Sequence, residues 1–117
     1  MTTPTAAVVR QARDFLAVET RWTQHGYAFN GANDLVSPCD EGAVRWCMVG
    51  AIAKCADVNQ PEMVEGIAVD LTDVAIRVGL LSAPNSVLDV NDHNSHREVL
   101  AYMANLADAL EREEASR

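Results

Sequence analysis

The most apolar stretch of this 117-residue chain covers residues 43–56 and reads AVRWCMVGAIAKCA, with charge only at Arg45 and Lys54. As a helix it would be about 21 Å long, enough to cross a small domain. Its apolar residues recur three and four positions apart on two faces, which predicts a central helix with neighbours on two sides. At Gly50 we expect another backbone to approach closely, with Trp46 closing the gap one turn earlier.

Around this stretch the sequence predicts a mainly α fold, a single helical domain over residues 1–117. Four helices are expected, with a short β-hairpin between the first and second. Thr3-Pro4 indicates the start of the first helix, which should run to about Thr20. The hairpin arms are predicted at residues 23–29 and 35–36, joined by turn dipeptides.

The second half of the chain provides the remaining two helices. The third is expected over residues 62–81, where Val69, Ile76 and Leu80 lie off the main apolar face and predict a second neighbour. Residues 87–94 are predicted to be a connector. Ser95 and Glu98 form a capping box that opens the fourth helix, and residues 111–117 are expected to be a frayed acidic tail.

The net charge of −8 is unevenly distributed. Residues 1–56 carry five basic and five acidic side chains, whereas residues 57–117 carry twelve acidic and four basic ones. Because phosphate binding needs basic surface, direct nucleic-acid binding is not expected. The acidity either keeps the protein in solution or meets a basic protein partner. In the second case we expect the partner on the outward faces of the last two helices, at Asp57, Glu62, Glu65, Asp70, Asp73, Asp108 and Glu111.

The three cysteines predict reduced thiols. No C-x-x-C motif occurs, and on one helix Cys47 and Cys55 would be about 12 Å apart, too far to bridge. No export signal precedes the first helix, and no apolar run reaches the length of a membrane span. We therefore expect a cytoplasmic protein that neither spans nor binds a membrane.

Two groups of residues are candidates for a chemical site. Cys47 is the first candidate nucleophile, but two turns inside an apolar helix its pKa would be raised, so core packing is favoured. Cys39, nearer a helix start, lacks an identifiable base. His93 and His96 are three positions apart, without the paired cysteines or third ligand of a zinc site. No metal, cofactor or catalytic residue is predicted.

A ligand pocket is the remaining candidate site. Trp22, Gln24, Tyr27 and Trp46 are candidates to line it, with Asn91 and Asp92 as polar contacts. The alternative, which we favour, is that the aromatic rings fill the joint between hairpin and helices, with their N–H groups bonded to backbone carbonyls.

Four short motifs carry a family resemblance: Trp22-Thr23-Gln24, the block from Val44 to Ile52, Asn91-Asp92, and Val99-Leu100. Together they resemble an uncharacterised family of small actinobacterial and actinophage proteins with a W-T-Q, W-C-x-x-G-A-I, N-D and V-L pattern. His25 departs from the usual glycine after the first motif. The resemblance implies a fold rather than a reaction, and its phage members imply an accessory protein that acts on a host factor.

Three classes of function therefore remain. The first is a small acidic, non-enzymatic interaction protein that binds a host or cellular protein. The second is a protein that sequesters a small ligand, nucleotide-like or another metabolite. The third, a hydrolase using Cys47 or the His93/His96 segment, comes last because no nucleophile, base and orienting group assemble in the sequence. Homo-oligomer formation stays open.

Overall fold

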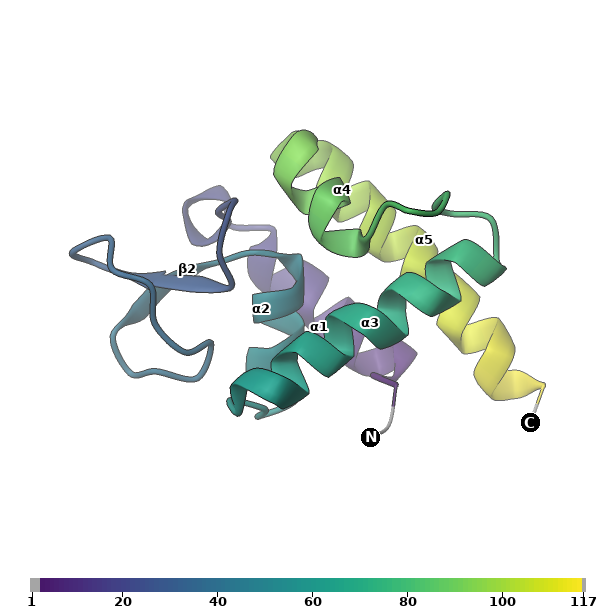
Figure 1. The fold of residues 1–117 in the computed structure, drawn as a ribbon, viewed down its shortest axis with the longest axis horizontal. Coiled ribbons are helices and arrows are strands. Elements are labelled where there is room, and N and C mark those ends of the chain that lie inside the picture. Colours follow the sequence, from purple (N-terminus) through teal and green to yellow (C-terminus); the bar gives the residue numbers. More distant parts are fainter. Residues whose placement is uncertain (1–2, 117) are drawn as a thin grey trace.

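The computed structural model describes residues 3–116, and within them the protein is mainly helical. Figure 1 shows the helices packed together, with a two-stranded sheet at one end of the molecule. In chain order the elements are α1 (Ala6–Leu16), the 3₁₀ turn η1 (Glu19–Arg21), β1 (Ala28–Asn30), β2 (Ala43–Trp46), α2 (Met48–Cys55), α3 (Pro61–Arg77), α4 (Val87–His93) and α5 (His96–Ala115). The antiparallel sheet lies between α1 and α2, as expected.

The core is built around α2 and α1. Every residue of α2 from Met48 to Ala53 is buried, and this helix contacts α1, α3 and α4. The buried stripe of α1 includes Val9 and Leu16 and packs against both α2 and α5. The apolar run 43–56 is thus central to the fold, with neighbours on more than two sides.

The prediction of one helix over residues 43–56 is wrong in its first part. Residues 43–46 form β2, which pairs antiparallel with β1, and Cys47 is the N-cap of α2. Long-range pairing outweighs the helical periodicity here, because pairing with Ala28 buries Trp46, while Val44, the extra residue of a bulge between Ala43 and Arg45, stays exposed. The predicted hairpin partner at 35–36 makes only an isolated bridge, between Phe29 and Leu35.

The predicted connector at 87–94 is also wrong, since most of it forms α4. This gives five α-helices within residues 3–116 instead of four. Ser86 caps α4 through a capping box with Asp89, the same geometry that a glutamate provides at this position. A helix of seven residues is too short to show a clear apolar period, so the cap was its only strong signal.

Several boundaries differ by a few residues. Thr5, not Thr3, caps α1, which ends at Leu16. α3 ends at Arg77 because Gly79 adopts a left-handed conformation (φ +82°) that terminates the helix. The Ser95–Glu98 capping box of α5 is confirmed.

The last helix extends into the segment for which fraying was expected. α5 continues to Ala115. There, the Ala6 N–H donates to a Glu114 carboxylate oxygen at 2.8 Å, and Arg77 pairs with Glu113 at 2.7 Å. None of the helices in residues 3–116 is long and apolar enough to cross a bilayer.

Candidate functional site

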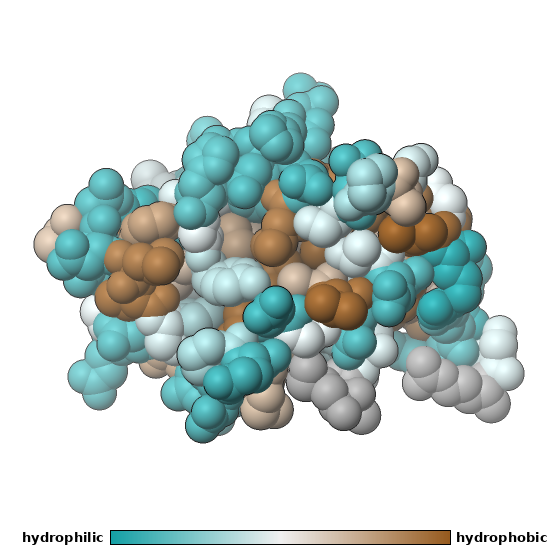
Figure 2. Space-filling view, viewed as in Figure 1, coloured by the Kyte–Doolittle hydropathy of each residue, from teal (hydrophilic) through white to brown (hydrophobic). Residues whose placement is uncertain are grey.

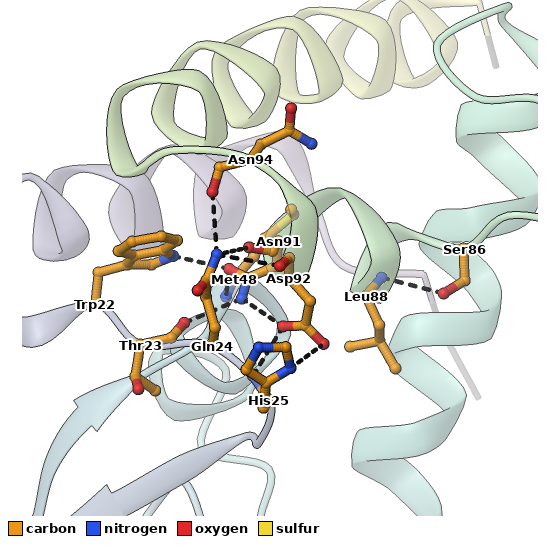
Figure 3. A network of polar contacts seen from close by, with 10 residues as sticks. All are labelled: Trp22, Thr23, Gln24, His25, Met48, Ser86, Leu88, Asn91, Asp92 and Asn94. Atoms are coloured by element: carbon orange, nitrogen blue, oxygen red, sulfur yellow. Dashed lines mark hydrogen bonds and ion pairs between the residues drawn. The ribbon is translucent and has the colours of Figure 1, made fainter.

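The centre of the polar contacts is Asn91 of α4, whose side chain is completely buried. Its Oδ1 accepts from Trp22 Nε1 at 2.9 Å and from the Met48 N–H at 3.0 Å, and its Nδ2 donates to the Thr23 carbonyl at 3.0 Å and to Asp92 Oδ1 at 3.1 Å (Figure 3). These four bonds use the full capacity of an amide side chain. Asn91 therefore ties the Trp22–Thr23 segment to the start of α2 and to α4.

The next two residues along the chain complete this contact with α4. Gln24 Nε2 lies 3.1–3.2 Å from the carbonyl oxygens of Asn91, Asp92 and Asn94 at the C-terminal end of the helix, where carbonyls lack helical partners. The backbone N–H of His25 donates to Asp92 Oδ1 at 2.9 Å, and the His25 ring lies 3.7 Å from Asp92 Oδ2. We call the contact of residues 22–25 with α4 and Met48 the Asn91 joint.

Trp46 fills a neighbouring space between the sheet and α1. Its indole N–H donates to the Pro38 carbonyl at 2.8 Å, and its ring meets Phe15 edge-on with centroids 4.8 Å apart. Of the six residues considered for a pocket, all but Tyr27 have side chains bonded to the protein itself, at Trp22, Gln24, Trp46, Asn91 and Asp92. Tyr27 and Asp92 are the two that line one of the hollows described next.

Tyr27 is positioned by the close approach predicted at Gly50. A Cβ atom on Gly50 would lie only 1.8 Å from the Tyr27 carbonyl oxygen, and that oxygen accepts from the Cys47 N–H at 3.2 Å. The backbone of Tyr27 is therefore pressed against the first turn of α2. Its half-buried side chain lines three hollows on the surface.

Each of the three hollows has a distinct lining. The neutral hollow, of about 310 Å³, is lined by Tyr27, Leu35, Val36, Ser37, Pro38, Asn59, Pro61 and Val64. The acidic hollow, of about 270 Å³, is lined by Tyr27, Glu65, Ala68, Val69, Thr72, Asp73, Ser86 and Leu88. The thiol hollow, of about 470 Å³, is lined by His25, Gly26, Tyr27, Leu35, Cys47, Leu88 and Asp92.

The three hollows adjoin one another around the Tyr27 side chain, and we call them together the Tyr27 groove. Tyr27 lines all three, Leu35 is shared by the neutral and thiol hollows, and Leu88 by the acidic and thiol hollows. In Figure 2, apolar side chains gather over the sheet end and the middle of this face, with polar side chains around them. Leu35 is 67% exposed and Val69 54%. The groove therefore presents apolar surface to solvent, with acidic side chains in the acidic and thiol hollows only.

Sequence reasoning missed most of this groove. Val69 was expected to be covered by a second neighbour, but it is exposed, and Ile76 is partly exposed as well. The signal was present in α3, where positions 61, 64, 65, 68, 69, 72 and 73 follow helical spacing and all line the groove. The opposite wall comes from residues distant in the sequence, which no local pattern joins to α3.

Cys47 differs from its predicted place, because it is the N-cap of α2 and not two turns inside a helix. Its sulfur accepts from the Gly50 N–H at 3.4 Å, an arrangement that favours a thiolate, but only 2% of the residue is exposed. Burial dominates and raises the pKa of the thiol to about 11. Within residues 3–116 no histidine is hydrogen-bonded to this sulfur, so the thiol is not activated.

The two histidines considered as metal ligands have different surroundings. His96 Nε2 lies 2.6 Å from the Leu16 carbonyl oxygen, and its ring packs 5.5 Å from that of Trp22. His93 is exposed at the end of α4. The part of the chain that the structure describes contains no group of three histidine, cysteine or acidic residues able to hold a metal ion.

The predicted acidic surface separates into distinct environments. Asp108 and Glu111 of α5 both pair with Arg10 of α1, at 3.0 and 2.5 Å. Glu65 and Asp73 line the acidic hollow, and Glu62 is exposed in the first turn of α3. Asp57 lies in the turn after α2, and Asp70 is half-buried. Part of the acidic set thus adjoins the groove that Tyr27 and Asp92 line.

Comparison with known proteins gives one match. The sequence model of a family of unknown function (DUF6197) matches residues 1–109, which confirms the expected resemblance to an uncharacterised family. No curated protein and no solved structure matches the chain.

Proposed function

We propose a function for this chain, which belongs to the family of unknown function DUF6197: it is a non-enzymatic module whose Tyr27 groove binds a segment of a partner protein. The observation that carries this proposal is that three hollows open around the side chain of Tyr27. Exposed apolar patches rimmed by polar residues mark interaction sites on soluble proteins. Leu35 and Val69 have the highest exposed fractions among the large apolar side chains of residues 3–116, and both line this groove.

The charge of the groove indicates the chemistry of the partner. Glu65, Asp73 and Asp92 line it, and His25 is the only basic type among its lining residues. A segment that combines apolar residues with Lys or Arg would be complementary in both respects. Such charges act chiefly on association rate and on the rejection of other partners, so binding should weaken as salt increases.

Binding of a small ligand is the second candidate. The thiol hollow, at about 470 Å³, falls within the usual size range of small-molecule sites. However, Asn91 and Gln24, which precede its lining residues Asp92 and His25 in the chain, use their amide donors within the joint and offer little for ligand specificity. A nucleotide or metabolite that raises the melting temperature strongly would reverse this order, because ligand at 100 times its Kd adds about 2.7 kcal/mol of stability.

A hydrolase remains the third candidate. A thiol with a pKa of about 11 is almost entirely protonated at neutral pH. The nearest candidate base in the same hollow, His25, has a side chain that is 70% exposed and faces Asp92.

For the proposed interaction protein, the resemblance to actinophage proteins makes a protein of the host cytoplasm the first natural partner to test.

Selection from a displayed library of random peptides tests the proposal. We expect peptides with apolar and basic residues to be enriched on the wild-type protein. Leu35→Ser should weaken their binding by about tenfold, roughly 1.4 kcal/mol. The control is Val44→Ser, which removes an apolar side chain that is 44% exposed and lies outside the groove. Equal binding by both variants, or no enrichment, would contradict the proposal.

A further inference from the structure

We infer that the segment bound in the Tyr27 groove is an amphipathic helix, with an apolar side chain in the neutral hollow and a Lys or Arg, seven residues away, in the acidic hollow. This inference rests on the proposed function and specifies its partner. It follows from three properties of the groove: its division by charge, the distance between its hollows, and the backbone groups along its walls.

The first property is the division by charge along α3. Pro61 and Val64 border the neutral hollow, whose lining contains no charged side chain. The next turns of the same helix bring Glu65 and Asp73 to the acidic hollow, whose lining contains no basic side chain. One end of the groove therefore suits an apolar group and the other a cation, since a cation in the neutral hollow would lose hydration without gaining a counter-charge.

The second property is distance. The α3 residues that line the two hollows are centred about seven positions apart, which is about 10 Å along a helix axis. In a bound helix, side chains at i and i+7 lie on one face at about this spacing. In an extended segment, about 10 Å corresponds to three residues, whose side chains point to opposite faces. Only the helix directs both side chains into the groove.

The third property is that several backbone groups along the walls are already bonded within the protein. One wall is the side of helix α3, whose backbone groups are bonded internally. On the opposite wall, the Val36 N–H donates to Ala28, the Ser37 carbonyl accepts from Asp40, and the Pro38 carbonyl accepts from Trp46. Addition of a strand needs a row of unpaired backbone groups, whereas a helix satisfies its own.

The experiment compares peptides selected on the wild-type protein with those selected on the double variant Glu65→Lys, Asp73→Lys. The wild type should enrich sequences with an apolar and a basic residue seven apart, and the variant should replace the basic residue by Asp or Glu at the same spacing. A double variant of equal charge change outside the groove, Glu19→Lys with Glu41→Lys, should retain the wild-type preference.

The outcomes separate this inference from the proposed function. If groove-dependent peptides are enriched but carry their apolar and basic residues three or four apart, or keep a basic residue on the charge-reversed variant, the inference is overturned and the proposed function stands. If no selected peptide is sensitive to Leu35→Ser, the proposed function itself fails. Helical circular dichroism of the bound peptide, measured as the difference from the free components, should accompany the expected result, and its absence would overturn the inference.

Discussion

The Asn91 joint and the Tyr27 groove are both built on residues 22–27, yet they are opposite in construction. In the joint, a buried amide uses all of its donors and acceptors, and the indole of Trp22 is bonded to it. In the groove, apolar side chains such as Leu35 and Val69 face solvent. The difference teaches that the W-T-Q and N-D residues form a structural contact, which positions Tyr27 beside the groove that we propose as a binding surface.

Replacing the central residue of the joint should give the largest effect. Asn91→Ala removes the acceptor of two buried donors, Trp22 Nε1 and the Met48 N–H, and each such loss costs about 1–3 kcal/mol. We expect the free energy of unfolding, measured by urea denaturation, to fall by about 3 to 5 kcal/mol in total. Asn105→Ala, on the exposed face of α5, is the control and should change it by at most about 0.5 kcal/mol. A small loss for Asn91→Ala would mean that water can replace the amide.

Changing the contact between the backbone of Tyr27 and α2 should lower the free energy of unfolding by nearly as much. Gly50→Ala places a Cβ 1.8 Å from the Tyr27 carbonyl oxygen, so backbone must move, and we expect a loss of about 2 to 3 kcal/mol. Gly31→Ala, where no atom lies within 4 Å of the added carbon, is the matched control. Equal stability of the two variants in thermal denaturation would show that Tyr27 is not held against α2.

The buried thiol of Cys47 should make the stability of the protein depend on pH. Burial raises the pKa of Cys47 to about 11 in the folded state, above the ordinary value of 9.0. The folded protein therefore retains a proton that the unfolded chain loses, so stability is full below pH 9 and falls as pH rises towards 11. The loss attributable to this thiol should reach about 2 to 3 kcal/mol.

Cys47→Ala isolates that contribution from the other groups that titrate in this range. The difference in unfolding free energy between wild type and variant should shrink above pH 9. Two parallel stability curves would contradict a buried, protonated thiol at this position.

The smallest effect on stability should come from the groove itself. Leu35→Ser removes an apolar side chain that is already two-thirds exposed, and we expect the free energy of unfolding to change by at most about 0.5 kcal/mol. The same variant should lose peptide binding, as described above. A large loss of stability would show that Leu35 belongs to the core, and it would contradict the claim that the Tyr27 groove, unlike the Asn91 joint, contributes little to stability.

The helical part of the fold could be predicted from local signals. The apolar stripes of α1, α3 and α5 and the Ser95 capping box are set by residues within a few positions of each other. Strand β2 could not be predicted from local signals, because residues 43–46 also fit a helical period and become a strand only through pairing with residues 28–30. For the same reason Cys47 was placed inside a helix and not at its start.

The candidate site was predictable only in pieces. Tyr27 and Asp92 were chosen as pocket residues, and Glu65 and Asp73 as part of an acidic surface, without any sign that the two sets meet. Their meeting depends on Gly50, which brings the backbone of Tyr27 against α2, and on α4, which was not expected to be a helix. Tertiary contacts of this kind leave no periodic trace in the sequence.

The most direct test of the central claim is an NMR titration of the isotope-labelled protein with the tightest peptide selected on it. The largest changes in amide shift should occur at Tyr27, Val69 and Leu88, which line the groove. Residues near the Arg10 ion pairs with Asp108 and Glu111 should change little. Shifts centred on those ion pairs, with Tyr27 and its neighbours unchanged, would contradict the assignment of the groove as the binding site.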